Sequence, residues 1–428
     1  MAQVRYDGTG DTVDLILNGQ YENPQLDAAC KLFIQHMKRK TLQELDSSIT
    51  REDFLGKLKS WPEKTTTSPS GVHLGHYHSL WKPHNINATT HPREAKLLEE
   101  KRETILQAHL AILNYAVKFG YSYQRWQNVV NVMIKKDSNS SRIHRLRVIH
   151  LYEADYNLLL AVKWRQATHH AEDSNLLNQG LYGSRPGRSA HDPVFIDIMQ
   201  NETYRASMKA GIHKELDATS CYDRILAWLA NTCSRRMGVH KMVAAVNCKT
   251  LEKAKYHLKT SMKVSDEFYQ HCTTHPIYGT GQGSGNSPHI WCFISSTLFD
   301  AFDAKAHGAT FYSYNGKQSI KIYMLGFVDD CSQQVNEFRS HPQPTAHRLV
   351  ELMQGDAQLW NNLLWTSGGA LEIPKCSFQI ISTEDPFSKG SATQYHSKSW
   401  ETMVPFKSNN YPATKPAEAW ALNSAQVA

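Results

Sequence analysis

The chain has 428 residues, of which 41% are hydrophobic and 20% charged, so it can bury a sizeable core and is neither collagen-like nor largely disordered. Lys and Arg exceed Asp and Glu by seven (47 against 40), which favours an anionic partner. No apolar run reaches the roughly 18 residues of a membrane span, and the acidic start of the chain differs from a secretion signal. We therefore expect a protein of the cytoplasm or nucleus with reduced cysteines.

The first part of the chain is predicted to be helical. Over residues 1–60, Thr50 and Asp53 have the spacing of a capping box in front of an apolar stripe. The strongest helical pattern runs from about Glu94 to Lys118, with acidic residues near its beginning. Gly120 follows this pattern and is a typical C-cap.

A basic hairpin is predicted next. Five Lys and Arg residues gather between Ile134 and Arg147, where Asp137 is the one acid, and the residues between them are turn-forming. From there on, short apolar runs alternate with turns and helical stretches, which indicates an α+β fold and not a regular βαβ repeat. After about Ser382 the chain is polar, and we expect poor order there.

A glycine-rich segment covers residues 279–288 (GTGQGSGNSP). A backbone with so few side chains can approach a ligand closely. Apolar residues at helical spacing follow it, and we expect Ser287 to be the N-cap of this helix and Pro288 to lie in its first turn. The glycine spacing matches neither a dinucleotide-binding fingerprint nor a P-loop.

Carboxylates stand where two predicted strands end. Asp217 ends an extended stretch, and Asp329 and Asp330 form a tight turn after an apolar one. Adjacent carboxylates repel each other unless a cation neutralises them, and hard oxygen ligands suit Mg²⁺. If the two strands are neighbours in one sheet, three carboxylates converge on one edge, as in a two-metal site for phosphoryl transfer. The alternative for the Asp pair is a solvated turn.

In order and spacing, these segments resemble the sequence blocks of reverse transcriptases, in particular those of non-LTR retroelements and group II introns. Asp217 with Tyr222 is similar to the first palm motif of that family. Gln282-Gly283 with Ser287-Pro288 is similar to its QGxxxSP loop, and residues 327–330 (FVDD) to its [YF]xDD turn.

Further blocks extend the resemblance over roughly residues 65–378. Residues 179–189 (QGLYGSRPGRS) are similar to the QxGFRPGRS block, and Arg147-Val148-Ile149 stands where the family has RPI. Residues 68–71 (SPSG) stand near its PGxDG segment, and residues 369–375 are similar to its lysine motif.

The resemblance implies a right-hand polymerase fold with fingers and palm, in which helices flank an antiparallel palm sheet. We expect an N-terminal helical extension at 1–60, fingers with part of the palm at 61–215, the palm at 216–383, and a polar tail at 384–428. Because no helical thumb is recognisable after Thr383, we expect the thumb to be largely missing and the chain to be a fragment of a retroelement polyprotein.

The resemblance also implies the roles of individual residues. Asp217, Asp329 and Asp330 would hold two Mg²⁺ ions, for which Mn²⁺ may substitute, and Lys375 would act as a catalytic general acid on the leaving pyrophosphate. Tyr222 would exclude a 2′-hydroxyl. The nucleotide would be bound by Lys136, Arg147, Ala218, Tyr222, Gln282 and Val328. Template and primer would be contacted by Arg185, Arg188, Gly283 and Ser287.

The expected activity is RNA-directed DNA synthesis, with an RNA template, a DNA primer, deoxynucleoside triphosphates and other element-encoded domains or subunits as partners. An RNA-dependent RNA polymerase is less well matched, because that class usually has Gly where Val328 precedes the Asp pair. A truncated, inactive product that only binds nucleic acid would keep the same carboxylates. Residues 212–216 (IHKEL) are more polar than the buried strand such a motif usually ends, which argues against tight packing there.

Overall fold

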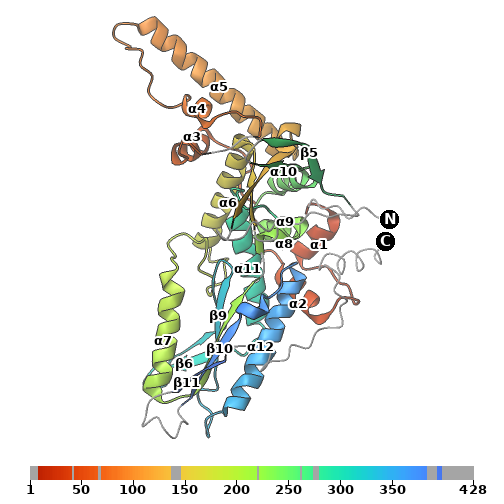
Figure 1. The fold of residues 1–428 in the computed structure, drawn as a ribbon, viewed down its shortest axis with the longest axis vertical. Coiled ribbons are helices and arrows are strands. Elements are labelled where there is room, and N and C mark those ends of the chain that lie inside the picture. Colours follow the sequence, from red (N-terminus) through yellow and green to blue (C-terminus); the bar gives the residue numbers. More distant parts are fainter. Residues whose placement is uncertain are drawn as a thin grey trace.

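The computed structural model describes residues 8–40, 43–65, 69–135, 146–218, 221–260, 263–272, 279–382 and 393–397. These residues form a mixed fold of helices and small sheets, as expected from the sequence. The molecule is elongated, with the two larger sheets towards its two ends and helix α11 between them (Figure 1). In the described part of the chain, each helix is too short or too polar to cross a membrane.

The elements follow one another along the chain in an irregular alternation of helices and strands. The helices are α1 (Asp11–Asn18), α2 (Ala28–His36), α3 (Arg51–Ser60), α4 (Leu74–His78), α5 (Pro92–Phe119), η1 (Gln124–Gln127), α6 (Ala154–Asp173), α7 (His191–Ser207), α8 (Cys221–Arg224), α9 (Ala227–Arg236), α10 (Lys241–Glu252), α11 (Ser287–Asp303), α12 (Ala346–Thr366) and η3 (Ile373–Lys375). The strands are β1 (Asn128–Lys135), β2 (Leu146–Leu151), β3 (Gly211–Asp217), β4 (Lys255–Lys259), β5 (Val264–Gln270), β6 (Ala309–Tyr312), β7 (Ser319–Ile322), β8 (Leu325–Phe327), β9 (Asp330–Val335), β10 (Ser377–Ser382) and β11 (Thr393–Ser397).

The helices predicted near the N-terminus are confirmed. Thr50 and Asp53 form a reciprocal capping box at the start of α3, because each side chain accepts a hydrogen bond from the backbone N–H of the other residue. Helix α5 extends the predicted range by one or two residues at each end. It stops at Gly120, which has a φ of 59° and can adopt this left-handed conformation because it has no side chain.

A four-stranded sheet has the order β2-β1-β4-β5. Strands β1 and β2 are antiparallel, with Ile134 opposite Arg147, whereas β4 runs parallel to β1. The antiparallel pair confirms the two arms of the predicted basic hairpin. Its tip at residues 136–145, which includes Lys136, lies outside the described residues.

A five-stranded antiparallel sheet has the order β11-β10-β3-β9-β8, with β3 in its centre. Helix α12 packs against β3, β9 and β10. The edge strand β11 comes from the segment that was expected to be a poorly ordered tail. The segment at 384–428 therefore contributes one strand to the sheet.

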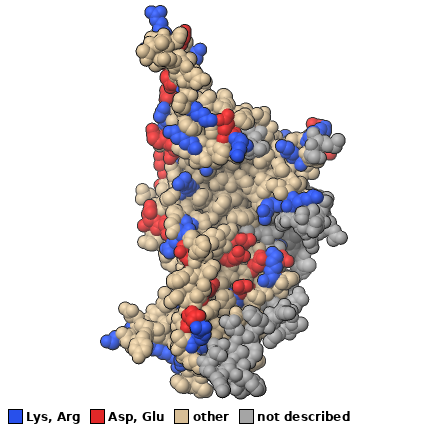
Figure 2. Space-filling view, turned by 60° about the vertical axis from the view of Figure 1, so that its left-hand side comes forward, with Lys and Arg blue, Asp and Glu red and all other residues tan. Residues whose placement is uncertain are grey.

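The excess of positive charge does not by itself locate a partner. Figure 2 shows one face of the molecule, on which Lys and Arg are intermixed with Asp and Glu. Among the described residues on that face, neither sign forms a continuous surface. An anionic ligand would therefore have to be bound by a local arrangement of residues on this face.

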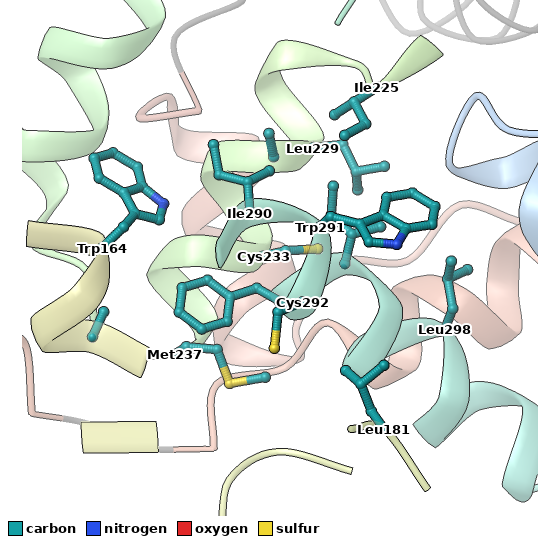
Figure 3. Packing of buried hydrophobic residues seen from close by; sticks show 14 of the residues in the cluster. Trp164, Leu181, Ile225, Leu229, Cys233, Met237, Ile290, Trp291, Cys292 and Leu298 are labelled. Atoms are coloured by element: carbon teal, nitrogen blue, oxygen red, sulfur yellow. The ribbon is translucent and has the colours of Figure 1, made fainter. Parts of the chain in front are cut away.

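Helix α11 is the centre of the core. It is apolar on nearly all sides, which is typical of a helix that is buried all round. Cys233 and Met237, at the end of α9, lie beside it together with Trp164 of α6 (Figure 3). Helix α2 packs against both α11 and α12, so the first 60 residues take part in one buried cluster that continues from Ile16 to Ile380.

Strand β3 is packed despite its polar sequence, which corrects the expectation for residues 212–216. Ile212, Lys214 and Leu216 alternate on the buried side of the strand. The side chain of Lys214 is fully buried, and its Nζ lies 3.4 Å from the carbonyl oxygen of Met353 in α12, to which it donates a hydrogen bond. Burial lowers the pKa of Lys214 to about 7, although the Asp356 carboxylate opposes this effect.

Lys214→Met should make the protein more stable below neutral pH. The buried Lys214 ammonium destabilises the folded protein, so Lys214 loses its proton near pH 7 when folded but only near pH 10.4 when unfolded. Between these two pH values the unfolded state binds more protons, and the free energy of unfolding of the parent therefore rises with pH. The advantage of the variant should therefore shrink by up to about 1.4 kcal/mol per pH unit above pH 7. Urea unfolding at several pH values measures this. Exposed Lys263, changed to Met, is the control. An increase in the free energy of unfolding for Lys214→Met that did not vary with pH would contradict the buried-ammonium explanation.

Candidate active site

Two of the predicted catalytic carboxylates stand directly opposite each other. Asp217 ends β3 and Asp330 begins β9, and the two residues are register partners in the antiparallel ladder. Directly opposed residues in such a ladder have Cα atoms roughly 4.5–5.5 Å apart. Asp329 precedes Asp330 in the turn between β8 and β9. The structure thus brings Asp217 and Asp330 together at one end of the sheet, with Asp329 adjacent in the chain.

The turn that carries the Asp pair is a strained two-residue hairpin. Phe327 and Asp330 pair across it, which leaves Val328 and Asp329 at its tip. Val328 has a φ of 61°, a left-handed conformation that is rare for a β-branched residue. The indole Nε1 of Trp291 donates a hydrogen bond of 2.5 Å to the Val328 carbonyl oxygen. This bond from the buried helix α11 helps to hold the turn in its strained form.

The segment with the sequence QGLYG supports the same turn from the side. The N–H of Gly326 in β8 donates to the Gly180 carbonyl oxygen, and Tyr182 N–H donates to the Gly326 carbonyl oxygen, both at 2.8 Å. A Cβ on Gly180 would collide with the carbonyl oxygen of Met324, and one on Gly183 would collide with the backbone of Val328. Glycine is therefore required at both positions for this close approach.

The carboxylates have an excess of negative charge. Desolvation and the neighbouring carboxylates of Asp329 and Asp217 raise the pKa of Asp330, and the Lys375 ammonium lowers it. Lys375 Nζ donates a hydrogen bond of 2.9 Å to Asp217 Oδ2, although 64% of its side chain is exposed. This contact raises the pKa of Lys375, so the group is a protonated ammonium at neutral pH.

The end of β3 holds Lys375 in place. The Glu372 N–H donates a hydrogen bond of 2.9 Å to the Asp217 carbonyl oxygen, and Ala218 forms an antiparallel bridge with Leu371. Helix η3 then brings Lys375 back to the Asp217 side chain. The lysine motif and the first palm motif are therefore one structural unit, although 158 positions separate Lys375 from Asp217.

The donor chemistry of this cluster fits a divalent cation. Within the described ranges, no group of three or more His, Cys, Asp or Glu residues is already arranged as a metal site. Carboxylate oxygens are nevertheless the ligands that Mg²⁺ prefers. Desolvation and the charges of Asp329 and Asp217 raise the pKa of Asp330, and the Lys375 ammonium opposes this shift only in part. Asp217, Asp329 and Asp330 are the residues that would hold such ions.

The glycine-rich loop is held by β2 and α6. The His150 N–H donates a hydrogen bond of 2.6 Å to the Gln282 carbonyl oxygen. Gly283 has a φ of 111°, and a Cβ there would collide with the carbonyl oxygen of His150. The side chain of Asn157 binds the loop at two points, because its Nδ2 donates to the Gly283 carbonyl oxygen (3.3 Å) and its Oδ1 accepts from the Gly285 N–H (2.5 Å).

The predicted roles of Ser287 and Tyr222 involve this loop, and one helix boundary needs correction. Asn286, and not Ser287, is the N-cap of α11. Ser287 is buried, and its Oγ lies 2.8 Å from the carbonyl oxygen of Gly281, so its hydroxyl closes the loop and is not open to a template or primer. The carbonyl oxygen of Tyr222 accepts a hydrogen bond from the Thr280 N–H, and its ring lies 6.3 Å from that of Trp291.

The three predicted arginines have different surroundings. Arg147 is exposed on β2. Arg185 is only 6% exposed, and its guanidinium forms a bidentate ion pair with Glu172 and also donates to two backbone carbonyls. Its donors are thus used inside the protein, and its contact with template or primer stays a prediction. Arg188 is partly exposed and lies over the ring of Tyr182.

Two supporting residues were missed by the sequence analysis. Asn157 lies in a helix that carries no recognised motif, and no local pattern indicates its contacts with the glycine-rich loop. Trp291 follows the QGxxxSP loop by one helical turn, and only the packing of α11 against the β8–β9 turn reveals its role. Trp291 positions the backbone of Val328 beside Asp329, and Asn157 positions the glycine-rich loop.

No protein-family model matches the chain, and a search of curated proteins found no match. The resemblance to reverse transcriptases therefore depends on the motifs in the sequence.

Gly283→Ala should destabilise the protein more than the same change at another glycine with positive φ. Gly316 has a φ of 67° in an open turn, where alanine should cost about 1–2 kcal/mol through the backbone conformation alone. At Gly283 the collision with His150 adds to this cost, and we expect a total of at least about 3 kcal/mol. Urea unfolding measures both variants. Equal losses of unfolding free energy in the Gly283→Ala and Gly316→Ala variants would show that the close approach of Gly283 to β2 contributes nothing to stability.

Proposed function

We propose that the chain is an RNA-directed DNA polymerase of a retroelement, which copies an RNA or DNA template by two-metal nucleotidyl transfer. The observation that carries the proposal is the register of β3 and β9, which pairs Asp217 with Asp330 next to Asp329. These are the carboxylates of the two palm motifs that the sequence resembles. In this proposal the five-stranded sheet is the palm and the four-stranded sheet belongs to the fingers of a right-hand fold.

The contacts around the carboxylates support this assignment. Helix α11 after the QGxxxSP loop, the QGLYG segment and the lysine motif are separate in the sequence, yet each is bonded to the β8–β9 hairpin or to Asp217. A solvated Asp-Asp turn would not need these contacts. Their convergence is what a nucleotidyl-transfer site requires, because such catalysis depends on positioning and on electrostatic stabilisation.

Each carboxylate and Lys375 have a role in the proposed reaction. Two Mg²⁺ ions, when bound by Asp217, Asp329 and Asp330, would activate the primer 3′-hydroxyl and neutralise charge on the transferred phosphoryl group. The three carboxylates must be ionised to bind cations. Lys375, whose pKa is raised by Asp217, keeps its proton at Nζ and would donate it to the leaving pyrophosphate.

The nucleotide would lie between the sheet end and the glycine-rich loop. Tyr222, whose carbonyl oxygen is hydrogen-bonded to this loop, would exclude a 2′-hydroxyl with its ring. Exposed Arg147 would contact the triphosphate. Ala218 and Val328 adjoin Asp217 and Asp329 in the chain, and their backbones are bonded to Leu371 and Trp291. Gln282 lies in the glycine-rich loop, where its carbonyl oxygen is bonded to His150. Arg188 remains the partly exposed arginine available to a template or primer.

A primer-extension assay with Mg²⁺ tests the proposal. The purified chain should add deoxynucleotides to a DNA primer on an RNA template, and Asp330→Asn should lower the rate by at least about 100-fold, because charge stabilisation by a metal is worth several kcal/mol. Exposed Asp266 on β5, changed to Asn, is the matched control and should leave the rate unchanged. Nucleic-acid binding without extension would favour the inactive product, and a preference for ribonucleotides would favour an RNA polymerase.

Lys375→Met should shift the acidic limb of the pH–rate profile for primer extension to higher pH. The ammonium lowers the pKa of Asp330, so its removal raises that pKa further, and a larger fraction of Asp330 is protonated at a given pH. The rate of the variant should therefore fall at a higher pH than that of the parent. Rate measurements from about pH 5 to 8 measure this shift. An acidic limb at the parent's pH would show that Lys375 does not act on Asp330.

A further inference from the structure

A cluster of exposed aromatic rings lies at the C-terminal end of α5, next to the four-stranded sheet. Tyr115, Phe119 and Tyr121 are 52%, 51% and 47% exposed. The ring centroid of Tyr115 lies 4.7 Å from that of Phe119 and 6.1 Å from that of Tyr121. Tyr123 continues the row at 5.1 Å from Tyr121 and packs on buried Trp126 at 4.8 Å. We call these four exposed or half-buried rings the aromatic platform.

The platform is not part of the core. Helix α5 buries the opposite side chains, among them Leu106, Leu113 and Val117, which belong to the main buried cluster. Tyr115 and Phe119 are one turn apart and point away from that stripe, as their exposure shows. Large exposed apolar groups that adjoin one another usually mark an interaction surface.

The charge around the platform favours an anionic partner. Residues 104–136 contain no Asp or Glu and four Lys or Arg residues. The Lys118 ammonium lies 5.5 Å from the ring centroid of Phe119. Lys249 of α10 donates a hydrogen bond of 2.9 Å to the Gly120 carbonyl oxygen, which brings a second ammonium to the base of the platform.

A second exposed apolar face, on α7, provides a contrast. Phe195, Ile198 and Met199 are at least half exposed, with Phe195 at 63%. This helix also carries Asp192, Asp197 and Glu202, so its local charge does not suit an anion. Of these two helix surfaces, the one on α5 combines exposed rings with an acid-free stretch of chain.

We propose that the aromatic platform binds single-stranded nucleic acid by base stacking. Exposed rings beside lysines are the features by which proteins hold single strands, because every base has an aromatic face and every phosphate a negative charge. A duplex keeps the faces of its bases stacked inside, so it suits the platform less well. The inference goes beyond the proposed function, since such binding does not require a catalytic site.

Binding of fluorescein-labelled oligo(rU) and oligo(dT) of about 20 nucleotides, measured by anisotropy, tests the proposal. The triple change Tyr115→Ala, Phe119→Ala and Tyr121→Ala should weaken binding by about tenfold or more, because stacking on one ring contributes about 1–3 kcal/mol. The same three positions changed to Leu keep an apolar surface but remove the flat rings, and should weaken binding equally. A matched triple change to Ala at Phe195, Ile198 and Met199 should leave binding unchanged.

Several outcomes would overturn the proposal. The parent chain could fail to bind either oligonucleotide, or the α5 and α7 variants could bind equally well. Full binding by the Leu variant would also reject stacking. If the α5 variants lost self-association while retaining oligonucleotide binding, the platform would be a protein interface. A catalytically dead Asp330→Asn chain should bind as the parent does, so failure of the platform and failure of the proposed function are distinguishable.

Discussion

The pairing of Asp217 with Asp330 across β3 and β9 is the constraint on which the site depends. The ladder fixes the two backbones, so the carboxylates cannot separate without loss of the register of the central strand. Desolvation, together with the charges of Asp329 and Asp217, raises the pKa of Asp330. The Lys375 ammonium, which is ion-paired with Asp217, balances part of this negative charge.

The neighbouring elements keep this unfavourable arrangement in place. A hydrogen bond from Trp291 and the close packing of the QGLYG backbone keep Val328 in its strained conformation. Beneath the sheet, the buried Lys214 adds a further cost that the packing of α12 on β3 must offset. Strain and charge concentrated at one sheet end, and stabilised by a large apolar core around α11, are typical of functional sites.

Local patterns predicted those features that depend on nearby residues. The capping box at Thr50 and Asp53 and the long helix α5 follow from hydrogen bonds and apolar spacing within a few turns. The same reasoning misplaced the N-cap of α11 by one residue, because the Ser287 hydroxyl is bonded to the preceding loop instead. It also misjudged residues 212–216, since it could not show that Lys214 lies under α12. Nor could it show that Arg185 forms an internal ion pair with Glu172.

The sequence by itself determined the candidate carboxylates, the glycine-rich loop and the mixed α and β character, because each is encoded by residue type and short spacing. Only the tertiary structure decided which of the carboxylates, loops and helices lie in contact with one another. The partner of Asp217 in the ladder is 113 positions away by number, and neither Asn157 nor Trp291 has a local signal for its contact. Such contacts depend on strand register and helix packing, which are set by the burial of the whole core and not by any one segment.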